Sequence, residues 1–256
     1  MAISSPLGSR QTVAALLTLT AVTGLVDAVS YLRLGRVFVA NMTGNVVFLG
    51  FSADPRSGLS AAASVIAIAG FLLGALAGGR AAHALAAARP RRWLAMAFTG
   101  EALILGAVAA LTGTGVLPFA GPGRFATIAV LAVALGVQNS TVRHLGAPDL
   151  TTTVLTLTIT GIAADSKLAG GAGSKSGRRL LSVATMLAGA VVGAALIRHA
   201  QAWWPLLIAG VALKSVSSPL KRFCARILNE AFAGKMSVPS QRVTTTILSP
   251  ANTGEA

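Results

Sequence analysis

The sequence predicts an all-α polytopic membrane protein with about six transmembrane helices and two short half-membrane segments, arranged as two inverted repeats. Three observations support this class. Of the 256 residues, 54% are hydrophobic and 11% are charged, whereas a soluble domain has about 25% charged residues. The apolar residues lie in runs long enough to cross a bilayer. The pattern of the first half of the chain recurs in the second half.

Eight apolar runs follow one another along the chain, at residues 11–33, 37–51, 59–88, 92–112, 124–142, 150–164, 178–200 and 202–213. A helix needs about 20 residues to span the hydrocarbon core, and runs of about 10 to 14 residues are more often re-entrant or interfacial. The second and sixth runs, each about 15 residues long, are therefore expected to enter and leave the membrane on one side. Six spans remain.

The basic residues indicate the orientation. With six spans, the basic connections around Pro90, after residue 142 and at 167–179 share the side of Arg10, which predicts a multi-pass protein of the bacterial inner membrane with both termini cytoplasmic. With eight spans the cluster around Pro90 moves outside and the bias disappears. Arg10 and the first run also have the outline of a cleavable signal peptide, but their recurrence in mid-chain favours a retained helix.

Three pairs of segments carry the internal repeat: Gly24–Ser30 with Gly136–Val142, Gly70–Gly74 with Gly189–Gly193, and Trp93–Gly100 with Trp203–Gly210. The predicted organisation is an N-terminal tail (1–10), a first membrane repeat (11–112) and a second membrane repeat (124–213). Internal symmetry of this kind is typical of transporters, and an odd number of spans per half inverts the second half. The alternative is that Gly and Ala simply recur in any membrane helix.

The net charge of +14 does not indicate a nucleic acid partner, because Lys and Arg lie between and after the apolar runs. We expect the lipid bilayer as the main surroundings and no nucleic acid. The single cysteine, Cys224, excludes an internal disulfide and a cysteine-rich metal site. No metal or cofactor is expected.

Polar residues inside the first two runs form the leading candidate site. An ionisable residue at a helix centre in a bilayer costs roughly 2.5 to 3.5 kcal/mol on insertion scales, so Asp27 is expected to face protein or a water-filled cavity. The second run contains Asn41, Thr43 and Asn45, and the sixth contains several threonines, among them Thr153. Such side chains can satisfy backbone groups of a broken helix, or hold a small polar solute or a cation. Threonines bonded to their own helix are the alternative.

The offset between the halves relates Asp27 to Asn139, beside Gln138. The predicted substrate- or ion-binding residues are Asp27, Asn41, Thr43, Asn45, Gln138, Asn139 and Thr153, with Arg33 and Arg143 compensating charge. A purely structural bridge between Asp27 and one of these arginines is the alternative. Glu101, in the middle of the fourth run, is a candidate of second rank because its counterpart is Val211.

The segment VDAVSYL at 26–32, followed by VFVANMTGN at 37–45, resembles the hallmark of the YoaK-like family of uncharacterised bacterial inner-membrane proteins, a domain of unknown function. The resemblance extends to Gly136–Asn139 and to Leu150–Gly161, and by general layout covers about residues 12–213. It implies a polytopic membrane protein. It supplies no substrate, reaction or catalytic residue.

Three classes of function remain open. The preferred class is a secondary transporter of a small solute, which a continuous polar cavity would favour. The second is a non-transporting binding or scaffold protein, which dry packing around Asn41 and Asn45 would favour. The third is an intramembrane enzyme, which requires Asp27 and Glu101 to converge on one cavity. Since HExxH, CxxC and GxSxG patterns are absent from the sequence, no catalytic residue is assigned.

Two further expectations concern contacts outside the core of the subunit. The glycine pairs are expected to pack helices within one subunit, and homo-oligomerisation through the same faces is the alternative. The C-terminal tail, 214–256, begins with apolar and basic residues at helical spacing, which suits an amphipathic helix lying on an anionic leaflet. Beyond Lys235 the composition predicts disorder.

Overall fold

The computed structural model describes residues 9–85, 90–145, 155–171 and 176–217, and this part of the chain is helical with no strand. Its helices are α1 (Ser9–Arg33), α2 (Met42–Phe51), α3 (Ala61–Leu85), α4 (Pro90–Gly113), α5 (Gly123–His144), α6 (Leu155–Ala164), α7 (Ser176–His199) and a last helix, Trp204–Ser217. Two 3-10 turns, η1 (Pro55–Ser57) and η4 (Lys167–Ala169), follow α2 and α6. The predicted all-α class is confirmed. Thr153 and the tail beyond residue 217 lie outside the described residues.

Five of the described helices, α1, α3, α4, α5 and α7, are long and apolar enough to cross a membrane. The two short predicted segments are present as α2 and α6, with ten residues each. Ten helical residues rise about 15 Å, half of the hydrocarbon thickness. The sixth predicted span differs from expectation. Within the described residues it is the helix Trp204–Ser217, which belongs with the shorter apolar helices.

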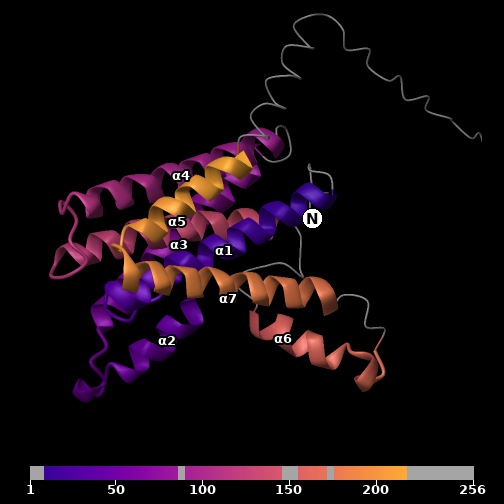
Figure 1. The fold of residues 1–256 in the computed structure, drawn as a ribbon, viewed down its shortest axis with the longest axis horizontal. Helices are drawn as coiled ribbons and strands as arrows, with labels where there is room; N and C mark the ends of the chain where they lie inside the picture. Colours follow the sequence, from indigo (N-terminus) through magenta and orange to yellow (C-terminus); the bar gives the residue numbers. More distant parts are fainter. Residues whose placement is uncertain (1–8, 86–89, 146–154, 172–175, 218–256) are drawn as a thin grey trace, which may run out of the picture.

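The long helices lie side by side, and α2 and α6 lie along one edge of this bundle (Figure 1). The most extensive contacts join α1 to α7 and α3 to α5. Each short helix packs against one long partner, α2 against α3 and α6 against α7. Glycines allow the close approach of the long helices: a Cβ on Gly74 of α3 would overlap the carbonyl oxygen of Val133 on α5, and a Cβ on Gly189 of α7 would overlap that of Ala21 on α1.

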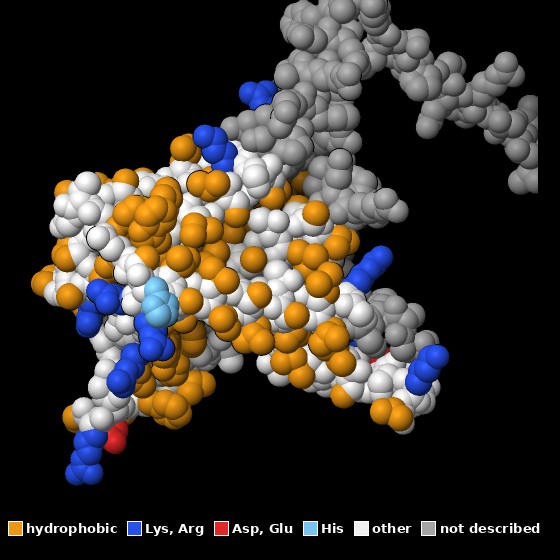
Figure 2. Space-filling model, in the orientation of Figure 1, with side chains coloured by type: hydrophobic (Ala, Val, Ile, Leu, Met, Phe, Trp, Pro, Cys, Tyr) orange, Lys and Arg blue, Asp and Glu red, His pale blue; other side chains and the backbone are white. Residues whose placement is uncertain are grey.

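The surface of α3 is the reverse of that of a helix in a water-soluble protein. Its buried residues are small: Ala63, Ser64, Ala67, Gly70, Gly74, Gly78 and Ala82. The large side chains of Leu72, Leu73 and Leu76 are 62%, 63% and 53% exposed. Lipid tails are as apolar as leucine, so this face is stable only in a bilayer. Figure 2 shows hydrophobic side chains across the body of the molecule and Lys and Arg towards its margins.

A tight turn after α1 brings the chain back to the bundle. Gly35 and Arg36 both have a positive φ, of 99° and 58°, which is the conformation that reverses chain direction and that glycine adopts most easily. Beyond the turn, Phe38 stacks on Tyr31 and on Phe48, with ring centroids 5.2 Å and 5.6 Å apart. These rings hold α2 beside the end of α1. Val39 and Ala40, in the segment between the two helices, contact Asp27.

Candidate solute-binding cavity

The two oxygens of Asp27 have different surroundings. Its side chain is buried, with 6% exposed. Oδ1 accepts hydrogen bonds from the backbone N–H groups of Val39 at 3.2 Å and Ala40 at 3.1 Å. Oδ2 is buried and has no hydrogen-bond partner among the described residues. Asp27 therefore anchors the segment before α2 through one oxygen, and its other oxygen has no partner among the described residues.

A cavity of about 420 Å³ lies beside Asp27, between α1, α2, α6 and α7. Its polar lining residues are Thr23, Asp27, Asn41, Thr43 and Thr156, and its apolar ones include Phe48, Ile159 and Met186. Small-molecule sites commonly occupy about 300 to 1,000 Å³ and combine an apolar wall with a few polar groups. Asn41 and Thr43 are exposed, so the cavity reaches the surface of the bundle. The arrangement suits a small solute with one charged group.

The two asparagines of the second run have different positions. Asn41 precedes α2, and its side-chain oxygen accepts from the N–H of Gly44 at 3.4 Å, which caps the helix at the cavity wall. Asn45 is fully buried and bonds to both backbone groups of Phe38: Nδ2 donates to the carbonyl at 2.6 Å and Oδ1 accepts from the N–H at 2.9 Å. Asn45 thus braces the segment from behind and does not line the cavity.

The remaining predicted residues of the described chain do not line this cavity. Asn139 is half-buried and donates to the carbonyl of Leu135 at 2.9 Å, while Gln138 is buried towards α1 and α4. Arg33 and Arg143 are exposed, and Arg33 lies over the ring of Phe119, 5.9 Å from its centroid. The structure does not bring either arginine to Oδ2 of Asp27, where the sequence predicted charge compensation.

Among the cavity residues that the sequence prediction did not select are Thr23, Thr156 and Met186. Thr23 precedes Asp27 by one helical turn, and that spacing could have identified it. Thr156 belongs to the threonine-rich run but could not be distinguished from its neighbours. Met186 has no signal in the sequence, because its position depends on how α7 packs on α1.

An ion pair holds α6 against α7. Arg179 Nη1 lies 2.5 Å from Asp165 Oδ2 and donates to the carbonyl of Gly161 at 2.7 Å. The Arg179 side chain is 14% exposed and that of Asp165 is 61% exposed, so the ion pair lies at the surface with the guanidinium packed against the protein. This contact fixes the end of α6 on α7. The start of α6, with Thr156, is thereby held at the cavity.

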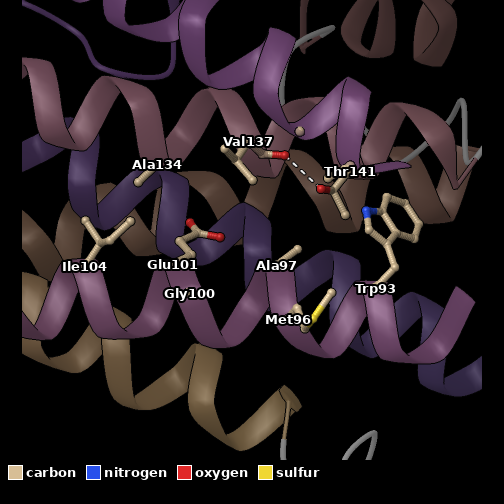
Figure 3. A pocket seen from close by; sticks show the side chains of 11 residues that line it. Trp93, Met96, Ala97, Gly100, Glu101, Ile104, Ala134, Val137 and Thr141 are labelled. Carbon is tan, nitrogen blue, oxygen red and sulfur yellow. Dashed lines mark hydrogen bonds between the residues drawn. The ribbon is translucent and has the colours of Figure 1, made fainter. Parts of the chain in front are cut away.

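Glu101 lines a second cavity, of about 170 Å³, between α3, α4 and α5. Figure 3 shows its carboxylate pointing from α4 towards the helix that carries Ala134 and Val137. Asp27 and Glu101 therefore line separate cavities. The convergence of two carboxylates that an intramembrane acid–base enzyme requires is not found among the described residues.

Comparison with known proteins agrees with this architecture. The family described as "Protein of unknown function (DUF1275)" matches residues 15–217, which include the cavity and the described helices around it. The UPF0700 transmembrane protein YoaK of Bacillus subtilis (strain 168) is 33% identical over 161 residues, which are 61% of this chain and 67% of that protein. No solved structure matches the chain.

Proposed function

Because this chain belongs to the family of proteins of unknown function DUF1275 and is a multi-pass membrane protein, we propose its function from its own cavity. It is a secondary transporter of a small solute that carries a positive charge. The observation that carries the proposal is the buried carboxylate of Asp27, which lines a cavity of about 420 Å³ and whose Oδ2 has no hydrogen-bond partner among the described residues.

The sign of the solute charge follows from the energetics of a buried carboxylate. An ionised carboxylate away from water is stabilised only by an opposite charge or by several hydrogen bonds. The Oδ2 atom of Asp27 has neither from the described residues, so a cation in the cavity supplies what the protein lacks. Thr23 and Asn41 offer further oxygens, and the ring of Phe48 offers a face that attracts cations. A neutral or anionic solute would leave the carboxylate uncompensated.

Matching contacts in the two halves support an inverted-repeat transporter. A Cβ on Gly24 of α1 would collide with the backbone of Met186 and Ala190 on α7. A Cβ on Gly136 of α5 would collide in the same way with the backbone of Phe71 and Ala75 on α3. The two glycines are 112 positions apart, and their partners on α3 and α7 are 115 positions apart in both cases. Exchanging the halves therefore exchanges the pair α1–α7 with the pair α5–α3. Transporters with such repeats bind solutes at the interface between the repeats.

The offsets of 112 and 115 positions also change which glycines of α3 and α7 correspond to each other. Gly74 approaches Val133 as Gly189 approaches Ala21, and Gly78 approaches Val137 as Gly193 approaches Leu25. The counterparts of Gly189 and Gly193 by contact are thus Gly74 and Gly78, one helical turn from the pair that the sequence suggested. The short helices α2 and α6 also correspond, and both line the cavity. This is where inverted repeats place broken helices and their solute.

The experiment is solute counterflow with proteoliposomes, which detects transport whether or not net charge moves. Proteoliposomes of wild type, of Asp27→Asn and of the control Asp54→Asn, which changes an exposed loop carboxylate, are preloaded with methylammonium or guanidinium chloride and diluted into the same solute labelled with ¹⁴C. At least one cation is expected to show saturable uptake in wild type and in Asp54→Asn, and none in Asp27→Asn. Equal uptake in wild type and Asp27→Asn, or no uptake above empty liposomes, would reject the proposal.

One observation favours a second function, a non-transporting binding or scaffold protein. Asn45 uses its whole amide to brace the backbone of Phe38, so part of the polar run serves packing. Cation-dependent thermal stabilisation of wild type but not of Asp27→Asn, without any uptake, would identify a binding protein.

A further inference from the structure

Three buried polar side chains connect the cavity of Glu101 to the cavity of Asp27. Glu101 on α4, Gln138 on α5 and Thr23 on α1 are 3%, 1% and 1% exposed. One end of the Gln138 amide lies 3.0 Å from Thr23 Oγ1, and the other end lies 2.5 Å and 3.1 Å from the two carboxylate oxygens of Glu101. Thr23 itself lines the Asp27 cavity. The Gln138 amide thus joins Glu101 to Thr23 directly. We name these three side chains the Glu101–Gln138–Thr23 chain.

These atomic positions accommodate two hydrogen-bond arrangements, because an amide nitrogen only donates and an amide oxygen only accepts. When Glu101 is ionised, Gln138 Nε2 donates to the carboxylate and Oε1 accepts from the Thr23 hydroxyl. When Glu101 is protonated, its hydroxyl donates to Oε1, and Nε2 donates to Thr23 Oγ1. The Thr23 hydroxyl then donates to the carbonyl of Leu19 at 2.9 Å. Each arrangement pairs both ends of the amide.

We propose that Glu101 is a proton-binding site and that the side-chain amide of Gln138 flips as the proton binds and leaves, so that the Asp27 cavity exchanges its cation for this proton. The proton site and the amide flip rest on the Glu101–Gln138–Thr23 chain alone. The exchange deepens the proposed function and rests on it.

The direction of coupling follows from Thr23. With Glu101 protonated, Thr23 Oγ1 accepts the amide N–H and its hydroxyl is turned to Leu19. With Glu101 ionised, Oγ1 donates to the amide and accepts nothing from it, so its lone pairs are available to a cation beside Asp27. The negative charge on Glu101 acts in the same sense. Cation binding therefore favours proton release, as exchange of one for the other requires.

A route for the proton leads along α4. The cavity of Glu101 is lined towards one end by Trp93, Met96 and Thr141 (Figure 3). A neighbouring cavity of about 200 Å³ shares Trp93 and Met96 and extends to Arg92, close to the start of α4. The two cavities follow one another along α4 from Glu101 to Arg92, with Trp93 and Met96 between them.

The charged groups around Glu101 lie at a distance from its carboxylate. Among the described residues, no cationic side chain lines its cavity. The groups that neighbouring helices present to α4 and to this cavity are uncharged. They are Gln138 and Thr141 on α5, Gly78 and Ala81 on α3, and Gly210 of the helix Trp204–Ser217, which packs on Ala102. Thr23 on α1 contacts Gln138. The titratable groups nearest by position are Asp27, one turn from Thr23 on α1, and Arg92, His83 and His144 at the far end, where the His144 ring lies 5.2 Å from His83 and 6.2 Å from Trp93. A proton is thus the counter-charge within reach of Glu101.

Infrared titration of the purified full-length protein tests the proton site and the amide. The stretching band of a protonated carboxyl group is followed from acidic to alkaline pH, with glutamine labelled by ¹³C at its side-chain carbonyl. Because the other carboxyl groups also titrate, the Glu101 band is taken as the difference between Asp27→Asn and Asp27→Asn/Glu101→Gln. This difference band is expected to disappear at high pH. The labelled amide band should shift over the same pH range. Gln138→Met assigns it, or, if that variant does not fold, replacement of the other glutamines, Gln11, Gln201 and Gln241.

The outcomes separate this inference from the proposed function, because the titration needs no solute and no transport. A difference band that is absent or does not change with pH, or an amide band that does not move with pH, overturns the inference even if uptake is observed. If both bands titrate, guanidinium is then added to weakly buffered protein. Proton release in wild type and none in Thr23→Val or Glu101→Gln is expected. Equal release in Thr23→Val overturns the coupling. No uptake with titrating bands would count against transport alone.

Discussion

Asp27 contributes an acceptor oxygen to the fold and a negative charge to the cavity, and substitutions can remove these two properties separately. Asparagine keeps an oxygen that can accept from Val39 and Ala40 but removes the charge, whereas leucine removes both. Leaving a buried N–H group unpaired costs about 1 to 3 kcal/mol. Asp27→Asn is therefore expected to unfold near the wild-type temperature, and Asp27→Leu to lose about 2 to 6 kcal/mol.

Thermal unfolding in one detergent, followed by the monodisperse fraction, measures this difference. Asn and Leu variants that are destabilised equally would mean that the charge of Asp27, and not its acceptor oxygen, stabilises the fold.

At the residue scale the sequence identified Asp27 because a charge inside an apolar run is costly in lipid. Asn41 and Thr43 were also predicted, and they line the cavity. Asn45 and Gln138 are polar for other reasons, since one braces backbone and the other joins three helices. Which helix face meets which neighbour depends on packing, and spacing within one run does not reveal it.

At the element scale, glycine spacing determines how the long helices pair. A Cβ on Gly74 or on Gly189 would overlap a backbone carbonyl of the partner helix, whereas a Cβ on Gly79 would meet nothing within 4 Å. Gly74→Ala and Gly189→Ala are each expected to destabilise the protein by about 1 to 3 kcal/mol or more, as overpacking does. The matched control Gly79→Ala is expected to be neutral, or stabilising by about 0.5 to 1 kcal/mol.

The same unfolding assay compares the three variants. Similar losses for Gly74→Ala and Gly189→Ala are required if these positions are equivalent in the two halves. A loss at Gly79 as large as at Gly74 would show that helix propensity, and not close approach, sets the effect.

The order and approximate limits of the helices could be predicted because hydropathy marks each membrane segment. The predicted run 59–88, for example, became α3, Ala61–Leu85. The last helix was harder to predict. Its apolar run, 202–213, has only twelve residues, and the described helix Trp204–Ser217 extends to the end of the described residues. The glycine alignment of the proposed repeat differs by one turn between the sequence and the contacts, because small residues recur every four positions in α3, as at Gly70, Gly74 and Gly78.

At the scale of the whole molecule, two half-length helices meet two long ones around a single carboxylate. The lipid-facing leucines of α3 and the small residues beneath them require a bilayer. The proposed orientation, with both termini in the cytoplasm of a bacterial inner membrane, rests on the distribution of Lys and Arg. The sequence could suggest two repeats, but only contacts between helices supply the offsets that relate them.

The central claim is that a cationic solute occupies the cavity beside Asp27, and chemical protection of Thr43 tests it most directly. Thr43 is exposed and lines the cavity, so Thr43→Cys in a Cys224→Ser background gives the purified protein a single thiol there. Guanidinium chloride is expected to slow its reaction with N-ethylmaleimide when Asp27 is present and to have no effect when Asp27 is replaced by Asn. Sodium chloride at the same ionic strength is the control. Labelling that guanidinium does not slow, or slows equally with and without Asp27, would contradict the account.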